Sequence, residues 1–267
     1  MDEVQKPEMQ SNPLADQIAA CAEGRPTPLV AHTFIERPAS SSYSRPVWLE
    51  CEDGNIYVVK GQHAGRAVFN EHAVGILGVA LGAPVPMPAQ VLIPQELTTT
   101  EPRMADITPG VAHGASWIRD TGDKQWLAYT DKPYNRARFA LLSILYGWLS
   151  ANDHQLIYSN QEPFRVHSVD HGHFFPKGPD WTEASLAGSP PPQPYPEIVN
   201  GCSLSEQETQ QSLDALAAIS SDQIAEAMGF PPDEWGVSMP ERVALGQFIA
   251  SRQGLLSNGH IPKNGDN

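Results

Sequence analysis

Short runs of β-branched and aromatic residues dominate the first third of the chain. Segments of this kind predict strands, and they occur at residues 29–37 (LVAHTFIER), 46–51 (PVWLEC) and 55–60 (NIYVVK). Between the last two, Glu-Asp-Gly-Asn at 52–55 predicts a tight hairpin turn, because Asp-Gly tolerates the positive φ that such turns require. The pattern therefore predicts an antiparallel sheet near the N-terminus.

A helical period appears next, at residues 67–77, and two further strand-like segments follow at 89–94 and 103–110. The second of these ends in a Pro-Gly pair, which we interpret as a hinge between two lobes. Backbone groups near Asp106 and Ile107 would then lie beside the edge of an adenine ring.

The second half of the chain has the longer periods of helices. Residues 136–149 (RARFALLSILYGWL) are apolar almost all round, which predicts a buried helix. After a proline-rich spacer at 188–196, three helix starts carry a serine followed three residues later by Glu or Gln, the pattern of a capping box. They are Ser205 with Glu208, Ser220 with Gln223, and Ser238 with Glu241.

The length of 267 residues suits one large domain, or one domain of two lobes. Residues 1–28 contain four prolines and one short amphipathic segment, and we interpret them as a partly disordered leader. The polar residues 257–267 predict a disordered tail. The domain itself is expected to span 29–256, with a small lobe at 29–107 and a large lobe at 108–256.

Charge and cysteine usage limit the possible partners and compartment. The chain has 17 Lys and Arg against 31 Asp and Glu, a formal net charge of −14, which disfavours nucleic acid as a partner. Its three cysteines are scattered, as expected in a reducing compartment. The N-terminus does not resemble a signal peptide, and the longest apolar run is too short to cross a bilayer. These features predict a cytoplasmic protein with no membrane partner.

Two aspartates lie at the ends of hydrophobic elements in the middle of the chain. Asp153 follows the apolar helix, and Asp170 follows a predicted strand at 164–169 after a turn at 158–163. Seventeen residues leave room for one hairpin-like excursion, which would bring both carboxylates to one cleft. In phosphoryl transfer, one Asp orients the attacking hydroxyl and a second holds the metal that bridges the phosphates.

Lys60 and Glu71 each place a charge in line with apolar residues. Strand alternation puts Lys60 on the face of Ile56 and Val58, and helical spacing puts Glu71 beside an apolar stripe. An ion pair between them would satisfy both charges and direct the lysine at phosphates, whereas two solvated side chains remain the alternative. In the preceding serine-rich loop, Ser41 and Ser42 either cover phosphates or belong to an ordinary polar loop.

In this order, these segments resemble the HipA-like kinases, a bacterial branch of the protein-kinase-like fold. The resemblance covers residues 29–256 and includes the C-terminal PPDEW and SRQGLL. Its motifs are YVVK with Lys60, the helix with Glu71, the apolar helix ending in Trp148, NDHQLIYSN with Asp153, and VDHGHFF with Asp170.

The resemblance implies an α+β, two-lobed fold, with an antiparallel sheet and one helix in the N-terminal lobe and a mainly helical C-terminal lobe. It also implies an ATP- and Mg²⁺-dependent kinase that transfers a phosphoryl group to a hydroxyl on a protein or small molecule. Lys60 would contact the phosphates with Glu71 beside it, Asp153 would act as base or orienting group, and Asp170 would bind the metal.

The chain departs from the family pattern beside Asp153. Family members usually have Arg after this Asp and a metal-binding Asn five residues beyond it, where this chain has His154 and Tyr158. Asn160 is the nearest substitute ligand. Two alternatives therefore stay open: a pseudokinase that binds nucleotide without catalysis, and a metal-dependent hydrolase that uses a histidine-rich cluster. The residues of that cluster are His167, Asp170, His171 and His173.

Overall fold

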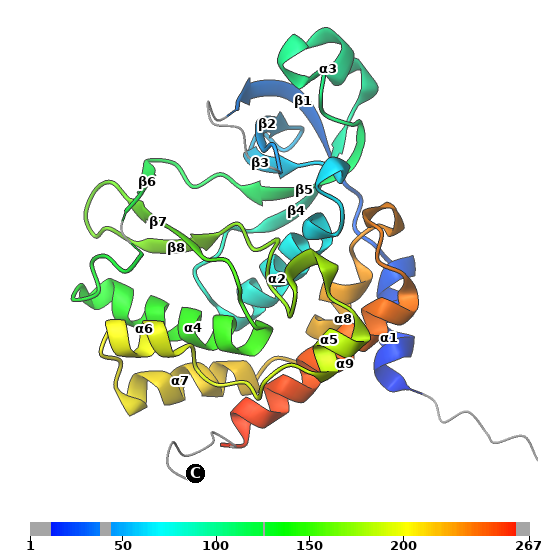
Figure 1. Ribbon diagram of the computed structural model, residues 1–267. Helices are drawn as coiled ribbons and strands as arrows, with labels where there is room; N and C mark the ends of the chain where they lie inside the picture. The colour runs from blue at the N-terminus through cyan, green and yellow to red at the C-terminus, as the bar shows by residue number, and fades with distance from the viewer. Residues whose placement is uncertain (1–11, 38–43, 125, 260–267) are drawn as a thin grey trace, which may run out of the picture.

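The computed structural model describes residues 12–37, 44–124 and 126–259 (Figure 1). It has a small lobe made of strands above a larger lobe made mostly of helices. The predicted two-lobed α+β architecture is confirmed. Ser41 and Ser42 of the serine-rich loop lie outside the described residues.

The small lobe is a closed barrel of five strands in the order β1-β2-β3-β5-β4. Four of the five pairings are antiparallel, and β1 pairs with β4 in parallel. Apolar side chains of these strands fill the interior, among them Leu49, Val59 and Val91, each with no exposed surface. The strands are β1 (Leu29–Glu36), β2 (Val47–Cys51), β3 (Ile56–Lys60), β4 (Pro88–Ile93) and β5 (Gly110–Ser116).

The position of β5 corrects the sequence prediction. The predicted strand at 103–110 is instead a 3₁₀ turn, η2 (Pro102–Met104), followed by a loop, and the strand begins where the hinge was expected. Strand β5 is rich in Gly and Ala because the closed barrel leaves little room: a Cβ on Gly114 would lie 2.7 Å from Val91 Cγ2. The chain therefore leaves the barrel after Ser116, not at residue 107. A short helix, α3 (Gln95–Thr100), precedes η2.

Helix α2 (Arg66–Leu81) follows β3 and a 3₁₀ turn, η1 (Gln62–Ala64). It lies between the barrel and the large lobe, in contact with β5, α4 and α8 (Figure 1). The helix ends at Gly82, whose φ of 75° is the left-handed conformation that favours glycine. This placement makes α2 the element that both lobes share.

A three-stranded sheet lies beside the barrel, above helix α4 (Figure 1). Its strands are β6 (Thr121–Asp123), β7 (Gln155–Ser159) and β8 (Val166–Val169), in the order β6-β7-β8 with antiparallel pairing. The sequence predicted β8 but assigned no strand to the other two segments. Strands β7 and β8 form the predicted hairpin, so the residues on either side of it are brought together.

Helices form the rest of the large lobe, and all three predicted capping boxes are present. The predicted buried helix is α4 (Pro133–Leu149), and its C-terminal half is fully enclosed. The other elements are η3 (Gly178–Asp180), α5 (Glu183–Ala187), α6 (Pro196–Gly201), α7 (Glu206–Ala217), α8 (Ser221–Gly229), η4 (Asp233–Trp235) and α9 (Met239–Ser257).

Helix α1 (Pro13–Glu23) forms from the amphipathic segment of the predicted leader. It packs against α8 and α9, and its Ile18 has no exposed surface. Burial of an isoleucine contributes about 1.5 to 3 kcal/mol, so this part of the segment belongs to the packed core of the large lobe. Across the described ranges, none of the helices combines the length and apolar character needed to traverse a bilayer.

Candidate functional site

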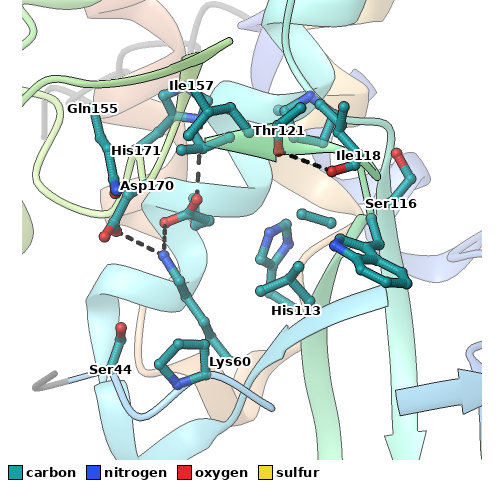
Figure 2. A pocket seen from close by; sticks show the side chains of 18 of the residues that line it. Ser44, Lys60, His113, Ser116, Ile118, Thr121, Gln155, Ile157, Asp170 and His171 are labelled. Carbon is teal, nitrogen blue, oxygen red and sulfur yellow. Dashed lines mark hydrogen bonds and ion pairs between the residues drawn. The ribbon is translucent and has the colours of Figure 1, made fainter. Parts of the chain in front are cut away.

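A cavity of about 470 Å³ lies between the barrel and the three-stranded sheet (Figure 2). Val58 and Ala115 line it from the barrel, and Ile157 and Val169 line it from the sheet. A smaller cavity of about 110 Å³ adjoins it and shares Ser44, Lys60, Glu71 and Asp170 with it. Asp153 lines the smaller cavity. The larger cavity is therefore an apolar slot, and the smaller cavity, which adjoins it, is lined by charged side chains.

Lys60 stands at the junction of the two cavities and bridges two carboxylates. Its Nζ donates to Glu71 Oε2 at 2.9 Å and to Asp170 Oδ1 at 2.6 Å (Figure 2). The predicted Lys60–Glu71 ion pair is thus confirmed as a contact, and the solvated alternative is wrong. The side chains of Lys60 and Glu71 are 11% and 6% exposed, whereas that of Asp170 is 46% exposed.

In Lys60 and Glu71, burial and the neighbouring opposite charges shift the pKa in opposite directions. Burial alone would lower the pKa of Lys60, but the charges of Glu71 and Asp170 outweigh it and leave that pKa raised. Burial would likewise raise the pKa of Glu71, but the Lys60 ammonium leaves it lowered. Both groups are therefore charged at neutral pH, and a cation is held ready beside the cavity.

Asp170 follows β8 with a φ of 62°, a conformation that turns its carboxylate into the cleft between the lobes. One of its oxygens accepts from Lys60, and the other has no hydrogen-bond partner in the described part of the chain. A half-exposed carboxylate oxygen at a cavity wall is a donor that Mg²⁺ and similar hard cations prefer. The residues present at this position fit a divalent cation.

The segment after Asp170 is tied to α2 through the fully buried Asn70. Asn70 Nδ2 donates to the carbonyl oxygens of Gly172 at 3.0 Å and Phe174 at 3.3 Å, and Trp181 Nε1 donates to Asn70 Oδ1 at 3.0 Å. Three hydrogen bonds to one buried amide resist separation of the two segments. Glu71, the next residue on α2, is thereby held beside Asp170.

Asp153 lies between α4 and β7 with an exposed side chain. The Cα atoms of Gln155 and Val169 are partners at the open end of the β7–β8 ladder. Asp153, two residues before Gln155, and Asp170, directly after Val169, therefore lie at the same end of the hairpin. Both line the smaller cavity. The hairpin therefore brings the two aspartates together as the sequence predicted.

Tyr158 and Asn160, the two residues considered in place of the usual metal-binding Asn, both lie away from Asp170. Tyr158 is fully buried, and its hydroxyl donates to the Trp126 carbonyl at 2.9 Å and accepts from the Ala128 amide at 3.1 Å. Asn160 lies just past the far end of β7, where its backbone N–H donates to the Asp120 carbonyl at 2.8 Å. It is five residue steps from Gln155, about 16 Å along an extended strand. Neither side chain lines the cavities.

The predicted adenine contacts also lie elsewhere. Asp106 pairs with Arg37 at 3.0 Å and Arg45 at 3.2 Å, and Ile107 is buried in the barrel core. Neither residue lines the cavity, because the chain crosses between the lobes after β5. The crossing that does line it runs from Ser116 to Ile118 (Figure 2). A correct assignment of β5 would have located it.

The histidines around Asp170 do not form a metal centre. His167 contacts Arg138 Nη2 through Nδ1 at 3.1 Å, and the buried His171 contacts Ser168 Oγ through Nε2 at 2.8 Å. No group of three His, Cys, Asp or Glu side chains in the described ranges is arranged to hold a metal ion. The histidine-based hydrolase is therefore not supported by the geometry.

Two further buried histidines form the wall behind Lys60. His72 Nδ1 lies 3.1 Å from His113 Nδ1, and the two side chains are enclosed between α2 and β5. Burial, and to a smaller extent the charge of the other histidine for His72 and of Lys60 for His113, lowers both pKa values well below 6.5. Both rings are neutral in the folded protein at neutral pH.

We expect this pair to make the protein sensitive to acid. The unfolded chain takes up these protons first, so the stabilisation is complete above about pH 6.5 and is lost as the pH falls, at about 1.4 kcal/mol per histidine per pH unit. Thermal unfolding between pH 7.5 and 5.5 should show the midpoint falling. His72→Gln should reduce the slope, whereas His32→Gln, at an exposed position, should not. Equal slopes in all three proteins would contradict the assignment.

Comparisons with known proteins agree with this geometry. Residues 33–156 match a family model described as HipA-like kinase, which confirms the predicted resemblance over a segment that includes Lys60, Glu71 and Asp153. No curated protein sequence matches the chain.

Solved structures of kinases are similar to the chain at low sequence identity. The Helicobacter pylori proinflammatory kinase CtkA is 11% identical with a TM-score of 0.50, over 86% of this chain and 96% of that one. The Golgi casein kinase is 11% identical with a TM-score of 0.45, over 93% and 77% of the two chains. A second structure of that kinase, with Mn/ADP bound, is 10% identical with a TM-score of 0.43, over 93% and 76%. The chain has a protein-kinase-like fold.

Proposed function

We propose that the protein is a kinase that uses ATP and a divalent cation, Mg²⁺ by preference, to phosphorylate a hydroxyl group on a protein or small molecule. The observation that carries the proposal is the buried Lys60, which bridges Glu71 and Asp170 at the junction of an apolar slot and a charged cavity. A lysine held by a helix carboxylate, beside a metal-binding aspartate, is the arrangement that orients nucleotide phosphates in kinases.

The larger cavity supports the placement of the nucleotide base. Val58 and Ala115 on one side and Ile157 and Val169 on the other present apolar surfaces to a flat ring. In the crossing from Ser116 to Ile118, the first two amides already donate to the carbonyls of Met87 and Ile56. Within the described chain, the Trp117 carbonyl and the Ile118 amide are the backbone groups left at the edge of the slot to hydrogen-bond to the ring. The phosphates would then extend toward Lys60 and Asp170.

Each charged residue of the site would have a separate role in phosphoryl transfer. Lys60 would neutralise phosphate oxygens, with Glu71 fixing its position, and Asp170 would hold the cation, which neutralises charge on the transferred group. Asp153, exposed in the smaller cavity, would accept a hydrogen bond from the attacking hydroxyl and orient it. Ser44 lines both cavities and is close to the proposed phosphate path.

The geometry favours an active kinase over a pseudokinase. The pseudokinase hypothesis arose because Tyr158 stands where the family has a metal-binding Asn. The Tyr158 side chain lies in the core, so it leaves the metal position open to another ligand. Asp153 and Asp170 line one cavity together with Lys60. Transfer of labelled phosphate from ATP to the protein itself or to a cell extract distinguishes the two. Nucleotide binding without transfer or hydrolysis, in Mg²⁺ or Mn²⁺, would establish the pseudokinase.

Nucleotide binding is the first test of the proposal. ATP with Mg²⁺ at a hundredfold excess over its dissociation constant should stabilise the folded protein by about 2.7 kcal/mol, because the ligand binds only the folded state. The measurement is the midpoint of thermal unfolding with and without the nucleotide. Asp170→Asn should abolish the metal-dependent part of the shift, whereas Asp214→Asn on the exposed face of α7 should leave it unchanged. No shift with any Mg-nucleotide would refute the proposed function.

A further inference from the structure

Strand β7 presents a single carboxamide to the nucleotide cavity. Along this strand, Leu156 and Tyr158 are buried in the core, and the alternate residues Gln155 and Ile157 line the cavity. Ile157 contributes an apolar surface, so Gln155 is the polar side chain that β7 supplies there. Its side chain is exposed to the cavity and to solvent.

Gln155 is a neighbour of Asp170 across the β7–β8 hairpin. The Cα of Gln155 is paired with that of Val169, the residue that precedes Asp170. Both residues line the cavity and are labelled in Figure 2. Gln155 Nε2 also lies 3.5 Å from Asp123 Oδ1, and Asp123 lines the cavity as well. Three oxygen-bearing side chains, from β6, β7 and the end of β8, therefore line one cavity.

We propose that the Gln155 carboxamide oxygen is the second protein ligand of the divalent cation held by Asp170. This inference rests on the proposed nucleotide-dependent function. Neither the amide oxygen of Gln155 nor the second oxygen of Asp170 accepts a hydrogen bond within the described ranges. A carboxylate and an amide oxygen are hard donors that suit Mg²⁺ and Mn²⁺, with phosphates and water completing the coordination.

Asp123 gives the carboxamide a defined orientation. The amide nitrogen is a donor and the oxygen an acceptor, so a carboxylate beside the nitrogen directs the oxygen elsewhere. Asp123 is therefore a positioning residue for Gln155 in this assignment.

Neither Tyr158, which stands where the family has its metal-binding Asn, nor Asn160, the substitute ligand suggested by the sequence, competes for this position. Tyr158 uses its hydroxyl in the core, and Asn160 lies at the opposite end of β7. The assignment also explains how the site accommodates the missing asparagine: the amide is supplied by the residue at the start of β7.

The test measures metal binding directly. The affinity of Mn²⁺ for the complex of the full chain with ADP is determined from the electron paramagnetic resonance signal of free Mn²⁺. The affinity for ADP without metal is measured by calorimetry in EDTA. The variants are Gln155→Leu, which removes the amide, Gln155→Glu, which keeps an oxygen donor, and Asn160→Leu, a control that removes an amide at the opposite end of β7. Circular dichroism verifies that each variant is folded.

We expect Gln155→Leu to weaken Mn²⁺ binding about tenfold or more, in the range found when metal-site residues are lost, and to leave metal-free ADP binding unchanged. Gln155→Glu should retain Mn²⁺ binding, and Asn160→Leu should match the wild type. Wild-type Mn²⁺ affinity in Gln155→Leu would overturn the ligand assignment while leaving the proposed function intact. Absence of ADP binding by the wild type, with or without metal, would overturn both.

Discussion

Asp153→Asn should reduce phosphoryl transfer by about two to four orders of magnitude, the contribution typical of a positioned catalytic acid or base. The carboxylate is exposed and lines the smaller cavity with Lys60 and Asp170, so it is placed to orient the acceptor hydroxyl. Because its side chain is not packed in the core, the substitution should leave the unfolding free energy and ATP affinity close to wild type. The measurement is single-turnover transfer from labelled ATP at saturating nucleotide.

The control for this substitution is Asp131→Asn, at an exposed position that lines neither cavity. Both substitutions remove one negative charge from the protein, so Asp131→Asn shows how much of the change in transfer is a general electrostatic effect. Transfer by Asp153→Asn within about tenfold of the control would show that another group orients the acceptor.

The Lys60–Glu71 pair should have the second large effect, on both stability and nucleotide binding. Removal of one partner leaves the other charge buried, which typically costs about 3 to 5 kcal/mol. Lys60→Met should therefore lower the unfolding free energy strongly, because it leaves the buried Glu71 without its cation. Glu71→Gln should lower it less, because Lys60 keeps its contact with Asp170 at 2.6 Å. The double variant should cost much less than the sum, because both changes break the same interaction. Urea unfolding without nucleotide measures all three.

The exposed ion pair of Arg103 with Glu101 is the matched control, since the Arg103 side chain is 61% exposed. Exposed ion pairs contribute little to stability because solvent screens them, so Arg103→Met should have little effect. Additive losses in the Lys60 and Glu71 variants would mean that the two side chains do not interact in solution. ATP binding should be weakened in both single variants, because Glu71 holds the lysine in place.

Local patterns in the sequence determined the elements whose residues alternate or repeat clearly. Strand β3 with Lys60, helix α2 with Glu71, helix α4 and the three capping boxes each follow from side-chain period and capping chemistry. The Lys60–Glu71 contact was also predictable, because a buried charge on each element required a partner nearby in the chain. The hairpin length was sufficient to predict that Asp153 and Asp170 share a cavity.

Tertiary structure decided the features that depend on contacts between distant segments. Strand β5 has few strand-forming side chains and is held by pairing with β3 and β4, so its sequence did not reveal it or the crossing after Ser116. Spacing from Asp153 directed the search for a further metal ligand to Tyr158 and Asn160. The register of β7 determines which of its side chains face the cavity, and Gln155 is one of them. A shift of one residue along a strand reverses the face of every side chain, so only the register of the folded sheet could decide this.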